Sequence, residues 1–246
     1  MPSVEWNRQA WGVEHEWAQE GDEWAGMAKH CGQPYPAWKS SLSATFIEPY
    51  ARDAEVLEIA PGHGRWTELI ASEARSVALV DINQSCLDAC SERFGDQSHI
   101  TYYLGDGANL PVPDASVDFV WSFDSFVHMD PPVVRSYVAE ISRVLRPGGT
   151  AILHHADKRP WSLVLVPITG RLGKPGRVMQ RIASQGRLRS GGWRSHLTGD
   201  MVARWARDSG LDVVRQTRSW GERGEYDVTR FRDLITVMRK SQDKSI

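Results

Sequence analysis

The sequence has few cysteines, no long apolar run and almost no excess of either charge. Its three cysteines, among 246 residues, include no Cys-x-x-Cys pair, so buried thiols in a reducing cytoplasm are the best interpretation. No apolar stretch approaches the roughly 20 residues of a membrane-spanning helix, and the polar, acidic start does not resemble a signal peptide. A formal net charge of −2 gives no global field that would attract nucleic acid or an anionic membrane. We therefore expect a cytoplasmic protein with no membrane partner.

Tryptophan, in contrast, is abundant, with eleven residues. Core packing is the first interpretation of this excess. Because tryptophan also stacks on the apolar faces of sugar rings and on flat ligands, the excess also favours a carbohydrate or aromatic substrate.

From residue 55 onward, short apolar runs alternate with helical patterns. This alternation predicts an α/β fold with right-handed crossovers and a parallel sheet. We expect a helical cap over residues 1–50 and an α/β domain over residues 51–246. The strands are expected at Glu55–Ile59, Ser76–Asp81, Ile100–Leu104, Val117–Ser122, Thr150–His154, Leu211–Gln216 and Asp233–Met238.

The segment 158–199 has a different composition, with nine Lys or Arg and no Asp or Glu. It follows the fifth expected strand, and open α/β sheets bind ligands beyond the carboxyl ends of their strands. A basic lid over the substrate is one interpretation; a solvated, variable loop is the other.

The turn after the first strand carries the clearest chemical signal. Gly62 and Gly64 allow a tight turn and a close approach of a ligand to the backbone. The helix that follows offers free N–H groups to a phosphate or a carboxylate. Asp81, at the end of the second strand, has the right chemistry to bind two ribose hydroxyls. The glycine spacing is not the Gly-x-Gly-x-x-Gly of dinucleotide sites.

Five segments, in order, resemble the class I S-adenosylmethionine-dependent methyltransferases. They are Glu58-x-Ala60-x-Gly62-x-Gly64, Asp81-Ile82, Gly105–Ala108, Asp118–Asp124 and Arg143–Gly149. The resemblance covers residues 50–155 and implies a Rossmann-like, seven-stranded, mostly parallel sheet with helices on both faces and an antiparallel last strand. Ala60 departs from the family, which usually has glycine there.

The resemblance also assigns residues to the cofactor, S-adenosylmethionine. Glu58, Ala60, Gly62 and Gly64 would hold its methionine end, and Asp81 with Ile82 its ribose. Asp106 and Gly107 would meet the adenine, and Ser122 would line the site of the sulfonium.

Candidates for the methyl-transfer step follow the fourth and fifth strands. The cofactor already supplies a good electrophile, so the protein must align the acceptor and remove its proton. His128 or His155 could act as a general base. Alternatively, Asp124 could hold Mg²⁺, with His155 or Asp157 as a further ligand. Any one of these side chains could also be structural.

The acceptor is the least determined part of the prediction. The N-terminal segment and the segment 158–199 are expected to wall its pocket, with the tryptophans Trp24, Trp38, Trp161 and Trp193. The sequence is also similar to actinobacterial enzymes that methylate the 1-hydroxyl of methylmannose oligosaccharides, which implies an oligosaccharide acceptor.

Two other acceptor classes stay open. One is a small phenol or carboxylate. The other is RNA, contacted by the basic segment but disfavoured by the net charge. A homodimer is also left open.

Overall fold

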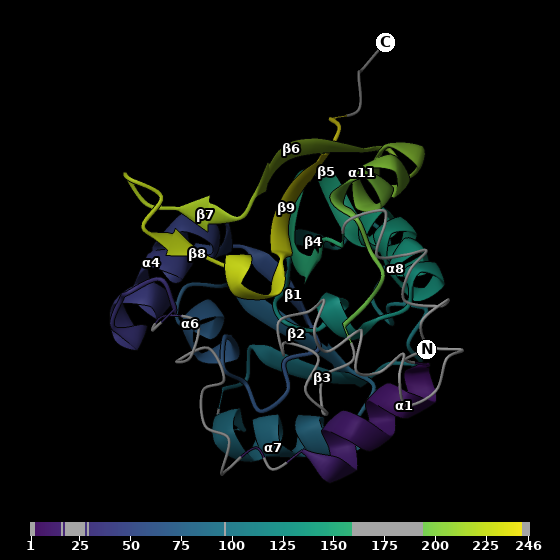
Figure 1. The fold of residues 1–246 in the computed structure, drawn as a ribbon. Helices are drawn as coiled ribbons and strands as arrows, with labels where there is room; N and C mark the ends of the chain where they lie inside the picture. Colours follow the sequence, from purple (N-terminus) through teal and green to yellow (C-terminus); the bar gives the residue numbers. More distant parts are fainter. Residues whose placement is uncertain are drawn as a thin grey trace, which may run out of the picture.

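One large sheet organises the chain in the computed structural model, which describes residues 3–15, 17, 28, 30–95, 97–158 and 194–242. Its strands lie in the order β3-β2-β1-β4-β5-β9-β6, and β9 runs antiparallel to both of its neighbours (Figure 1). The predicted seven-stranded sheet with an antiparallel last strand is confirmed. The strands are β1 (Glu55–Ile59), β2 (Ser76–Asp81), β3 (Ile100–Leu104), β4 (Val117–Ser122), β5 (Leu145–Ala156), β6 (Leu211–Thr217) and β9 (Asp233–Lys240).

The register brings the carboxyl ends of the central strands to one edge. Ile59 of β1 pairs with Val80 of β2, and Asp81 pairs with Leu104 at the end of β3. β4 is paired with β1 on one side and with β5 on the other. The loops that follow β1, β2, β3 and β4 are therefore neighbours, which is the condition for a shared site at this edge.

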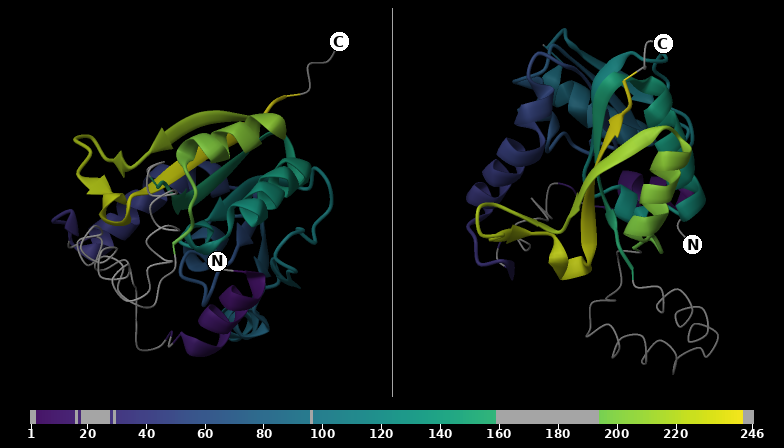
Figure 2. Two further views of the ribbon diagram at one scale, coloured as in Figure 1. Left: turned by 45° about the vertical axis from the view of Figure 1, so that its right-hand side comes forward. Right: turned by 90° about the horizontal axis from the view of Figure 1, so that it is seen from above.

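Helices cover both faces of the sheet. α4 (Tyr35–Phe46), α5 (Glu48–Ala51), α6 (Thr67–Ala71) and α7 (Gln84–Phe94) lie on one face, and α8 (Pro131–Val144) and α11 (Gly199–Asp208) on the other (Figure 2). The two faces correspond to two apolar clusters, one rich in aromatic rings and one mostly aliphatic. The near-continuous apolar strands follow from burial on both sides.

The short remaining elements lie around this framework. α1 (Val4–Gln9) and the π-helix η1 (Ala10–Glu14) form the N-terminal end, and the hairpin of β7 (Ser219–Trp220) and β8 (Tyr226–Asp227) packs beside α4. Two single turns, η2 (Phe126–His128) and η3 (Thr229–Phe231), precede α8 and β9. No described helix is both long enough and apolar enough to cross a bilayer.

Tryptophan serves the core first, as expected. Trp38, Trp66, Trp121 and Trp220 are buried, and their rings contact one another and Phe123 edge-on or stacked. Trp38 was expected to wall an acceptor pocket, but it lies fully buried in this core. Trp24, Trp161 and Trp193 lie outside the described residues, as does most of the predicted basic lid, residues 159–193.

The segment before the expected fifth strand differs from the prediction. The expected strand Thr150–His154 lies inside β5, which already begins at Leu145. Its register with β4 shifts between Val117 and Phe119, so Arg146–Gly149 forms an irregularity within the strand instead of a separate turn. Arg146 holds this irregularity in place through ion pairs with Asp118 and Glu55.

Gly64 offers a test of how the turn after β1 packs. Gly64 and Gly210 have nearly equal left-handed φ angles of 80° and 79°, but only at Gly64 would an added Cβ overlap a neighbour, the Phe94 ring of α7. Gly210→Ala should cost about 1–2 kcal/mol of strain, and Gly64→Ala about 1–3 kcal/mol more from overpacking. Urea unfolding of both variants measures the difference. Equal losses would show that the Phe94 contact does not require glycine.

Candidate active site

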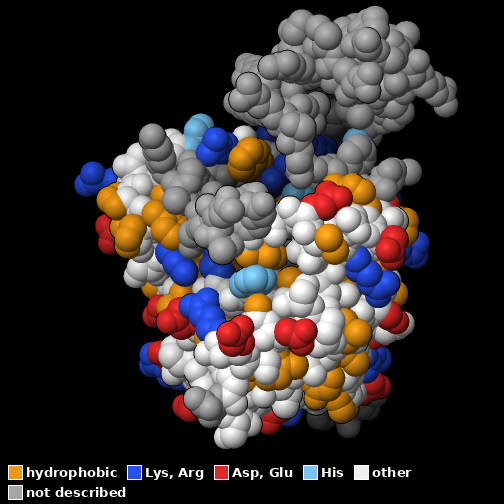
Figure 3. Space-filling view, turned by 90° about the horizontal axis from the view of Figure 1, so that it is seen from below, with side chains coloured by type: hydrophobic (Ala, Val, Ile, Leu, Met, Phe, Trp, Pro, Cys, Tyr) orange, Lys and Arg blue, Asp and Glu red, His pale blue; other side chains and the backbone are white. Residues whose placement is uncertain are grey.

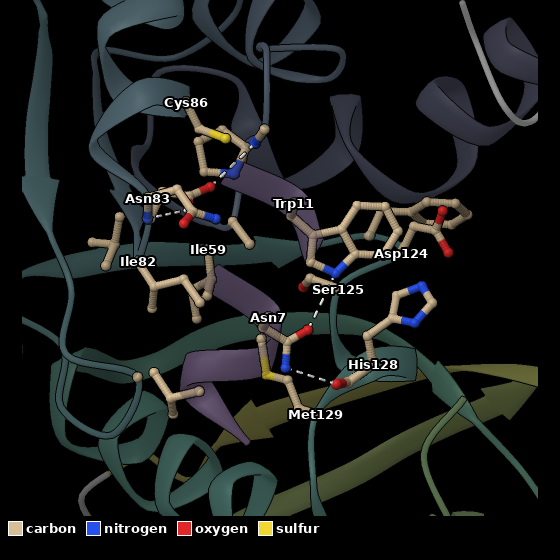
Figure 4. Close-up of a pocket in the computed structure, with 18 of the residues that line it drawn as sticks. Asn7, Trp11, Ile59, Ile82, Asn83, Cys86, Asp124, Ser125, His128 and Met129 are labelled. Atoms are coloured by element: carbon tan, nitrogen blue, oxygen red, sulfur yellow. Dashed lines mark hydrogen bonds between the residues drawn. The ribbon is translucent and has the colours of Figure 1, made fainter. Parts of the chain in front are cut away.

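A cavity of about 120 Å³ lies at the carboxyl ends of β1, β2 and β4. The loops after β1, β2, β3 and β4 line it, together with the start of α8 and the N-terminal segment, residues 3–15 and 17. We call this cavity the main cleft. Figure 4 shows Asn83 and Cys86 at one end of it, and Asp124 and His128 at the other.

The turn after β1 forms the floor of the main cleft. Ala60 and Gly62 line it, and both have a φ of 57°. The turn closes when Gly64 N–H donates to the Pro61 carbonyl over 3.0 Å. Gly64 itself lies behind the lining, against α7. A left-handed φ is strained for alanine and not for glycine, so Ala60 keeps the backbone shape of a glycine-rich turn at a cost.

Glu58 lies buried behind this turn, outside the lining of the main cleft. It is 2% exposed, and Thr67 at the start of α6 donates its hydroxyl to Oε2 over 2.6 Å. Burial raises the pKa of the Glu58 carboxyl to about 7, against the Thr67 hydrogen bond that lowers it, and nearby Asp81 raises it further. Glu58 therefore anchors the turn to α6 and adds negative potential behind Asp81.

Asp81 is the carboxylate that reaches the main cleft. It is 5% exposed, and its oxygens accept the Asn83 N–H at 2.9 Å and the Gly62 N–H at 3.4 Å. Burial raises the pKa of the Asp81 carboxyl to about 6, although these backbone hydrogen bonds lower it. A carboxylate kept in such a place, with lone pairs remaining, is suited to accept hydrogen bonds from a ligand. Ile82 lines the cleft beside it.

The loop after β3 contributes backbone and not the predicted carboxylate. Gly107 lines the main cleft, whereas Asp106 is exposed and absent from the lining. Both Asp106 oxygens accept hydrogen bonds from its own turn, from the N–H groups of Ala108 and Asn109 and from the Asn109 side chain. The same hydrogen bonds lower the pKa of Asp106. Its side chain shapes the loop.

The loop after β4 supplies the polar groups at the far end. Asp124, Ser125 and His128 line the main cleft. Ser122 does not: it is fully buried, donates to the Ile59 carbonyl over 2.8 Å and lies 2.7 Å from the Ser125 hydroxyl. Ser125 thus takes the position at the surface of the cleft that the sequence had assigned to Ser122.

His155 and Asp157 lie away from the main cleft. The His155 ring is fully buried, with Nε2 2.7 Å from the Thr236 hydroxyl and Nδ1 2.8 Å from the Ala156 carbonyl. Burial lowers its pKa to about 4. Asp157 accepts the Gly199 N–H over 2.7 Å and pairs with Arg218. The structure keeps both side chains away from the cleft and gives each of them partners within the fold, so it does not support the predicted catalytic and metal roles of His155 or the predicted metal role of Asp157.

The predicted Mg²⁺ site therefore does not form from Asp124, His155 and Asp157. Within the described part of the chain, no three His, Cys, Asp or Glu side chains come together in a group that could hold a metal ion. Mg²⁺ prefers several oxygen ligands in octahedral geometry, and Asp124 alone does not provide them.

The N-terminal segment closes one wall of the main cleft, which the sequence did not reveal in detail. Asn7 donates its side-chain N–H to the His128 carbonyl over 3.0 Å and accepts from Trp11 Nε1 at 3.2 Å (Figure 4). The centroids of the Trp11 and His128 rings lie 4.8 Å apart. No motif or spacing marks Asn7, because its partner is 121 positions away.

The same segment fills part of the space that the glycines leave. A Cβ on Gly62 would meet Trp17, and one on Gly107 would meet Val4. Trp17 also stacks on His63 with ring centroids 4.6 Å apart. Because ligand pockets usually measure roughly 300–1,000 Å³, a large ligand would require the N-terminal segment to move outward.

Residues 56–149 match the family model described as a methyltransferase domain. A Mycolicibacterium smegmatis protein named "Probable S-adenosylmethionine-dependent methyltransferase" is 35% identical over 108 residues, covering 44% of this chain and 40% of the relative. The phthiotriol/phenolphthiotriol dimycocerosates methyltransferase of Mycobacterium tuberculosis is 33% identical over 108 residues, covering 43% of this chain and 38% of the relative. The chain thus spans about two fifths of the length of these curated relatives.

A solved structure resembles nearly the whole chain. It is the magnesium protoporphyrin IX methyltransferase from Synechocystis PCC 6803 with bound S-adenosylhomocysteine. The TM-score is 0.60 and the sequence identity is 16%. The similarity covers 98% of this chain and 95% of that one. At this identity the likeness shows the fold. The chain therefore has the Rossmann-like fold of these methyltransferases, and residues 56–149 are the part that matches the methyltransferase-domain model.

Ala60 gives a test of strain at this site. Ala60→Gly should stabilise the protein by up to about 1 kcal/mol. Relief of the left-handed strain at alanine raises the free energy of unfolding by about 1–2 kcal/mol, and the greater freedom of glycine in the unfolded chain lowers it by about 0.4–1 kcal/mol. Ala115, with a φ of 47° in an exposed loop, is the matched control and should gain similarly on Ala115→Gly. Thermal unfolding measures both. Destabilisation by Ala60→Gly alone would show that the Ala60 methyl group makes a packing contribution larger than the strain.

Proposed function

We propose that the protein is a methyltransferase that uses S-adenosylmethionine and acts on a small-molecule acceptor. The observation that carries the proposal is the buried Asp81 carboxylate facing the main cleft beside the glycine turn, inside the segment that matches the methyltransferase domain. In a purely structural turn, that carboxylate would have no reason to be held at a surface that costs it solvation, and the glycine spacing of this turn is not that of a dinucleotide site.

The residues present fit the nucleoside part of this cofactor. Asp81 would accept hydrogen bonds from the ribose hydroxyls, as its position at the end of β2 and its spare lone pairs allow. Ile82 and Gly107 offer apolar surface and free backbone for the adenine. Ala60 and Gly62 would face the methionine end, while Glu58 and Gly64 keep the turn in shape from behind. Asp106 would act through its loop.

The acceptor end of the main cleft has the groups for alignment and proton removal. When bound, the cofactor supplies a methyl group on a positively charged sulfur, which is already electrophilic. His128 and Asp124 both line the cleft. In this proposal His128 takes a proton from an acceptor hydroxyl, and Asp124 orients that hydroxyl or stabilises the charged imidazole. Asn7 holds the His128 backbone from the other side. No step requires a metal ion.

For the acceptor we propose a hydroxyl group on a ring that tryptophan can cover. Trp11, Trp17 and Trp66 line the main cleft, and tryptophan faces pack on sugars as well as on phenols. A sugar hydroxyl, such as the 1-hydroxyl of a methylmannose oligosaccharide, is the first candidate, and a phenol or carboxylate is the alternative. Among the relatives, the Mycobacterium tuberculosis enzyme is named for phthiotriol and phenolphthiotriol dimycocerosates, and an Oryza sativa protein is named as a probable tocopherol O-methyltransferase.

RNA is the least favoured acceptor. On the face shown in Figure 3, the described basic and acidic side chains are interspersed. Recognition of a phosphate backbone usually needs a stripe of one sign.

Cofactor affinity should depend on pH through Asp81. Its raised pKa of about 6 means that the carboxyl takes up a proton as the pH falls through about 6, and so loses its charge and its ability to accept from two ribose hydroxyls at once. Calorimetry with S-adenosylhomocysteine should therefore show full affinity at pH 7.5–8, and a loss that approaches tenfold per unit below about pH 6. Asp81→Asn should bind weakly with a flatter profile. Absence of binding by the wild-type protein at every pH would contradict the cofactor assignment.

The stability of the ligand-free protein should change in the opposite sense. A carboxyl whose folded-state pKa is raised binds its proton more tightly when folded, so unfolding releases protons and stability falls as the pH rises from the ordinary value of 3.8 to about 6. Urea unfolding at several pH values checks this sign. Asp81→Asn should remove part of the slope.

The acceptor end is tested by Asp124→Ala and His128→Ala. A screen with labelled donor against sugars, phenols and carboxylates, with and without EDTA, first identifies the acceptor. Both variants should then lower turnover by about 100-fold or more and leave affinity for S-adenosylhomocysteine within about threefold of wild type. His155→Gln, in the buried residue next to the loop network, is the control and should keep turnover. Unchanged rates in both test variants would remove this end of the cleft from the mechanism, and loss of transfer in EDTA would contradict a metal-free reaction.

A further inference from the structure

A buried histidine lies directly behind the acceptor end of the main cleft. His154 is fully buried in β5, and its Nδ1 accepts the backbone N–H of Asp124 over 3.1 Å. The His154 ring also stacks on Phe123, with ring centroids 4.2 Å apart and planes at 14°. Phe123 and Asp124 both line the main cleft, so His154 contacts two consecutive residues of its wall from behind.

The other side of the His154 ring faces a buried carboxylate. Nε2 lies 3.4 Å from Oδ2 of Asp233, the first residue of β9, and Asp233 forms an ion pair with Arg194. Arg194 is fixed in turn by the Phe231 ring, which lies 4.6 Å from its guanidinium carbon. A carboxylate at Nε2 favours the tautomer with the proton on that nitrogen, and this leaves Nδ1 as the acceptor that the Asp124 N–H requires.

The protonation state agrees with this arrangement. Burial lowers the pKa of His154, against the opposing effect of Asp233. The pKa of Asp233 is held below its ordinary value by Arg194 and His154 despite burial. A neutral ring between an ionised carboxylate and a backbone N–H can satisfy both neighbours, whereas a doubly protonated ring would turn a donor towards the Asp124 N–H.

Asp124 needs such a support because its backbone is strained. Its φ is 68°, in the left-handed region, which residues other than glycine adopt rarely, although aspartate adopts it more readily than most. Strained residues persist only where surrounding contacts fix them, and they concentrate at functional sites. The hydrogen bond to His154 acts on the strained residue itself.

We infer that His154 is a positioning residue, which, oriented by Asp233 and Arg194, holds Asp124 in the conformation that presents its carboxylate to the acceptor. The inference rests on the proposed role of Asp124 in methyl transfer. It assigns a role in the reaction to three residues that do not line the cleft, from β5, from β9 and from the loop before α11.

His155 provides an internal comparison. Neighbouring residues of a strand point to opposite faces, so His155 faces Thr236 instead of the cleft. Both histidines are fully buried, and both have hydrogen bonds through their ring nitrogens. A substitution of either one removes a similar amount of buried ring, but only His154 contacts Asp124.

The experiment compares wild type with His154→Leu, His154→Asn and His155→Leu in uniformly ¹⁵N- and ¹³C-labelled protein. The amide coupling constant and the ¹³Cβ shift of Asp124 report its φ. His154→Leu should move both reporters out of the left-handed range, and His155→Leu should leave them as in wild type. His154→Asn should restore them, because Asn Oδ1 can accept where Nδ1 did. Wild-type values for Asp124 in His154→Leu would overturn the inference.

Kinetics with the acceptor found in the screen give the second readout. His154→Leu should lower kcat roughly tenfold to 100-fold, as misplacement of a reacting group does, with little change in KM, and His154→Asn should recover most of it. Affinity for S-adenosylhomocysteine should stay within about threefold in every variant. An unchanged kcat in His154→Leu would overturn the inference, whereas a wild-type protein that binds no S-adenosylhomocysteine would overturn the proposed function instead.

Discussion

The candidate site depends on the parallel register of β1 with β2 and of β1 with β4. Because Ile59 pairs with Val80 and Glu58 pairs with Trp121, the three strands end together, and their loops enclose one cleft. A slip of one residue in any of these pairings would turn Asp81 or the turn after β1 away from it. The apolar residues that fix the register are buried on both faces of the sheet. The stability of the core and the geometry of the site therefore depend on the same contacts.

The fold buries two carboxyl groups beside this edge of the sheet, and their loss of hydration destabilises the folded protein. Glu58 and Asp81 are both almost inaccessible. Burial raises the pKa of both carboxyl groups, and Asp81 raises that of Glu58 further. In the ligand-free protein, the Thr67 hydroxyl and the N–H groups of Gly62 and Asn83 offset only part of the lost hydration. A ligand that brings hydroxyl donors to Asp81 would offset more of it. Binding and the relief of this desolvation are thus coupled, which is how a buried acid can give affinity without a large contact area.

The sequence was sufficient for most of the sheet and insufficient for the far end of the cleft. Apolar runs of five or six residues predicted β1 to β4 to the residue. For β1, β2 and β4 the reason is burial on both faces, which tolerates few polar positions. The resemblance to the methyltransferases assigned Ala60, Gly62, Asp81, Ile82 and Gly107 to the cofactor, and all five line the cleft, because they follow the ends of those strands. For Asp106 and Ser122 the predicted loop was right, but the predicted orientation of the side chain was not, because a loop's own hydrogen bonds decide which side chain turns inward.

Which of His154 and His155 faces the cleft depends only on the alternation of side chains along β5. The irregularity at Arg146–Gly149 prevents that alternation from being predicted from the sequence. Asn7 and Trp11 could not have been found, since their contacts to His128 are purely tertiary.

Strain is distributed around the cleft in a way that separates its two ends. Ala60 at the cofactor end and Asp124 at the acceptor end both have left-handed backbone conformations, yet their supports differ. Ala60 is held by the sheet itself, through its N–H to the Val80 carbonyl at 2.7 Å, so its geometry is as rigid as the β1–β2 pair. Asp124 is held through a side chain, by a ring that depends on Asp233 and Arg194 from distant parts of the chain. Rigid backbone support suits a site that must recognise one invariant cofactor. Support through replaceable side chains leaves the proposed acceptor end open to change, because a substitution at His154 or Asp233 can alter Asp124 while the strands at the proposed cofactor end keep their register.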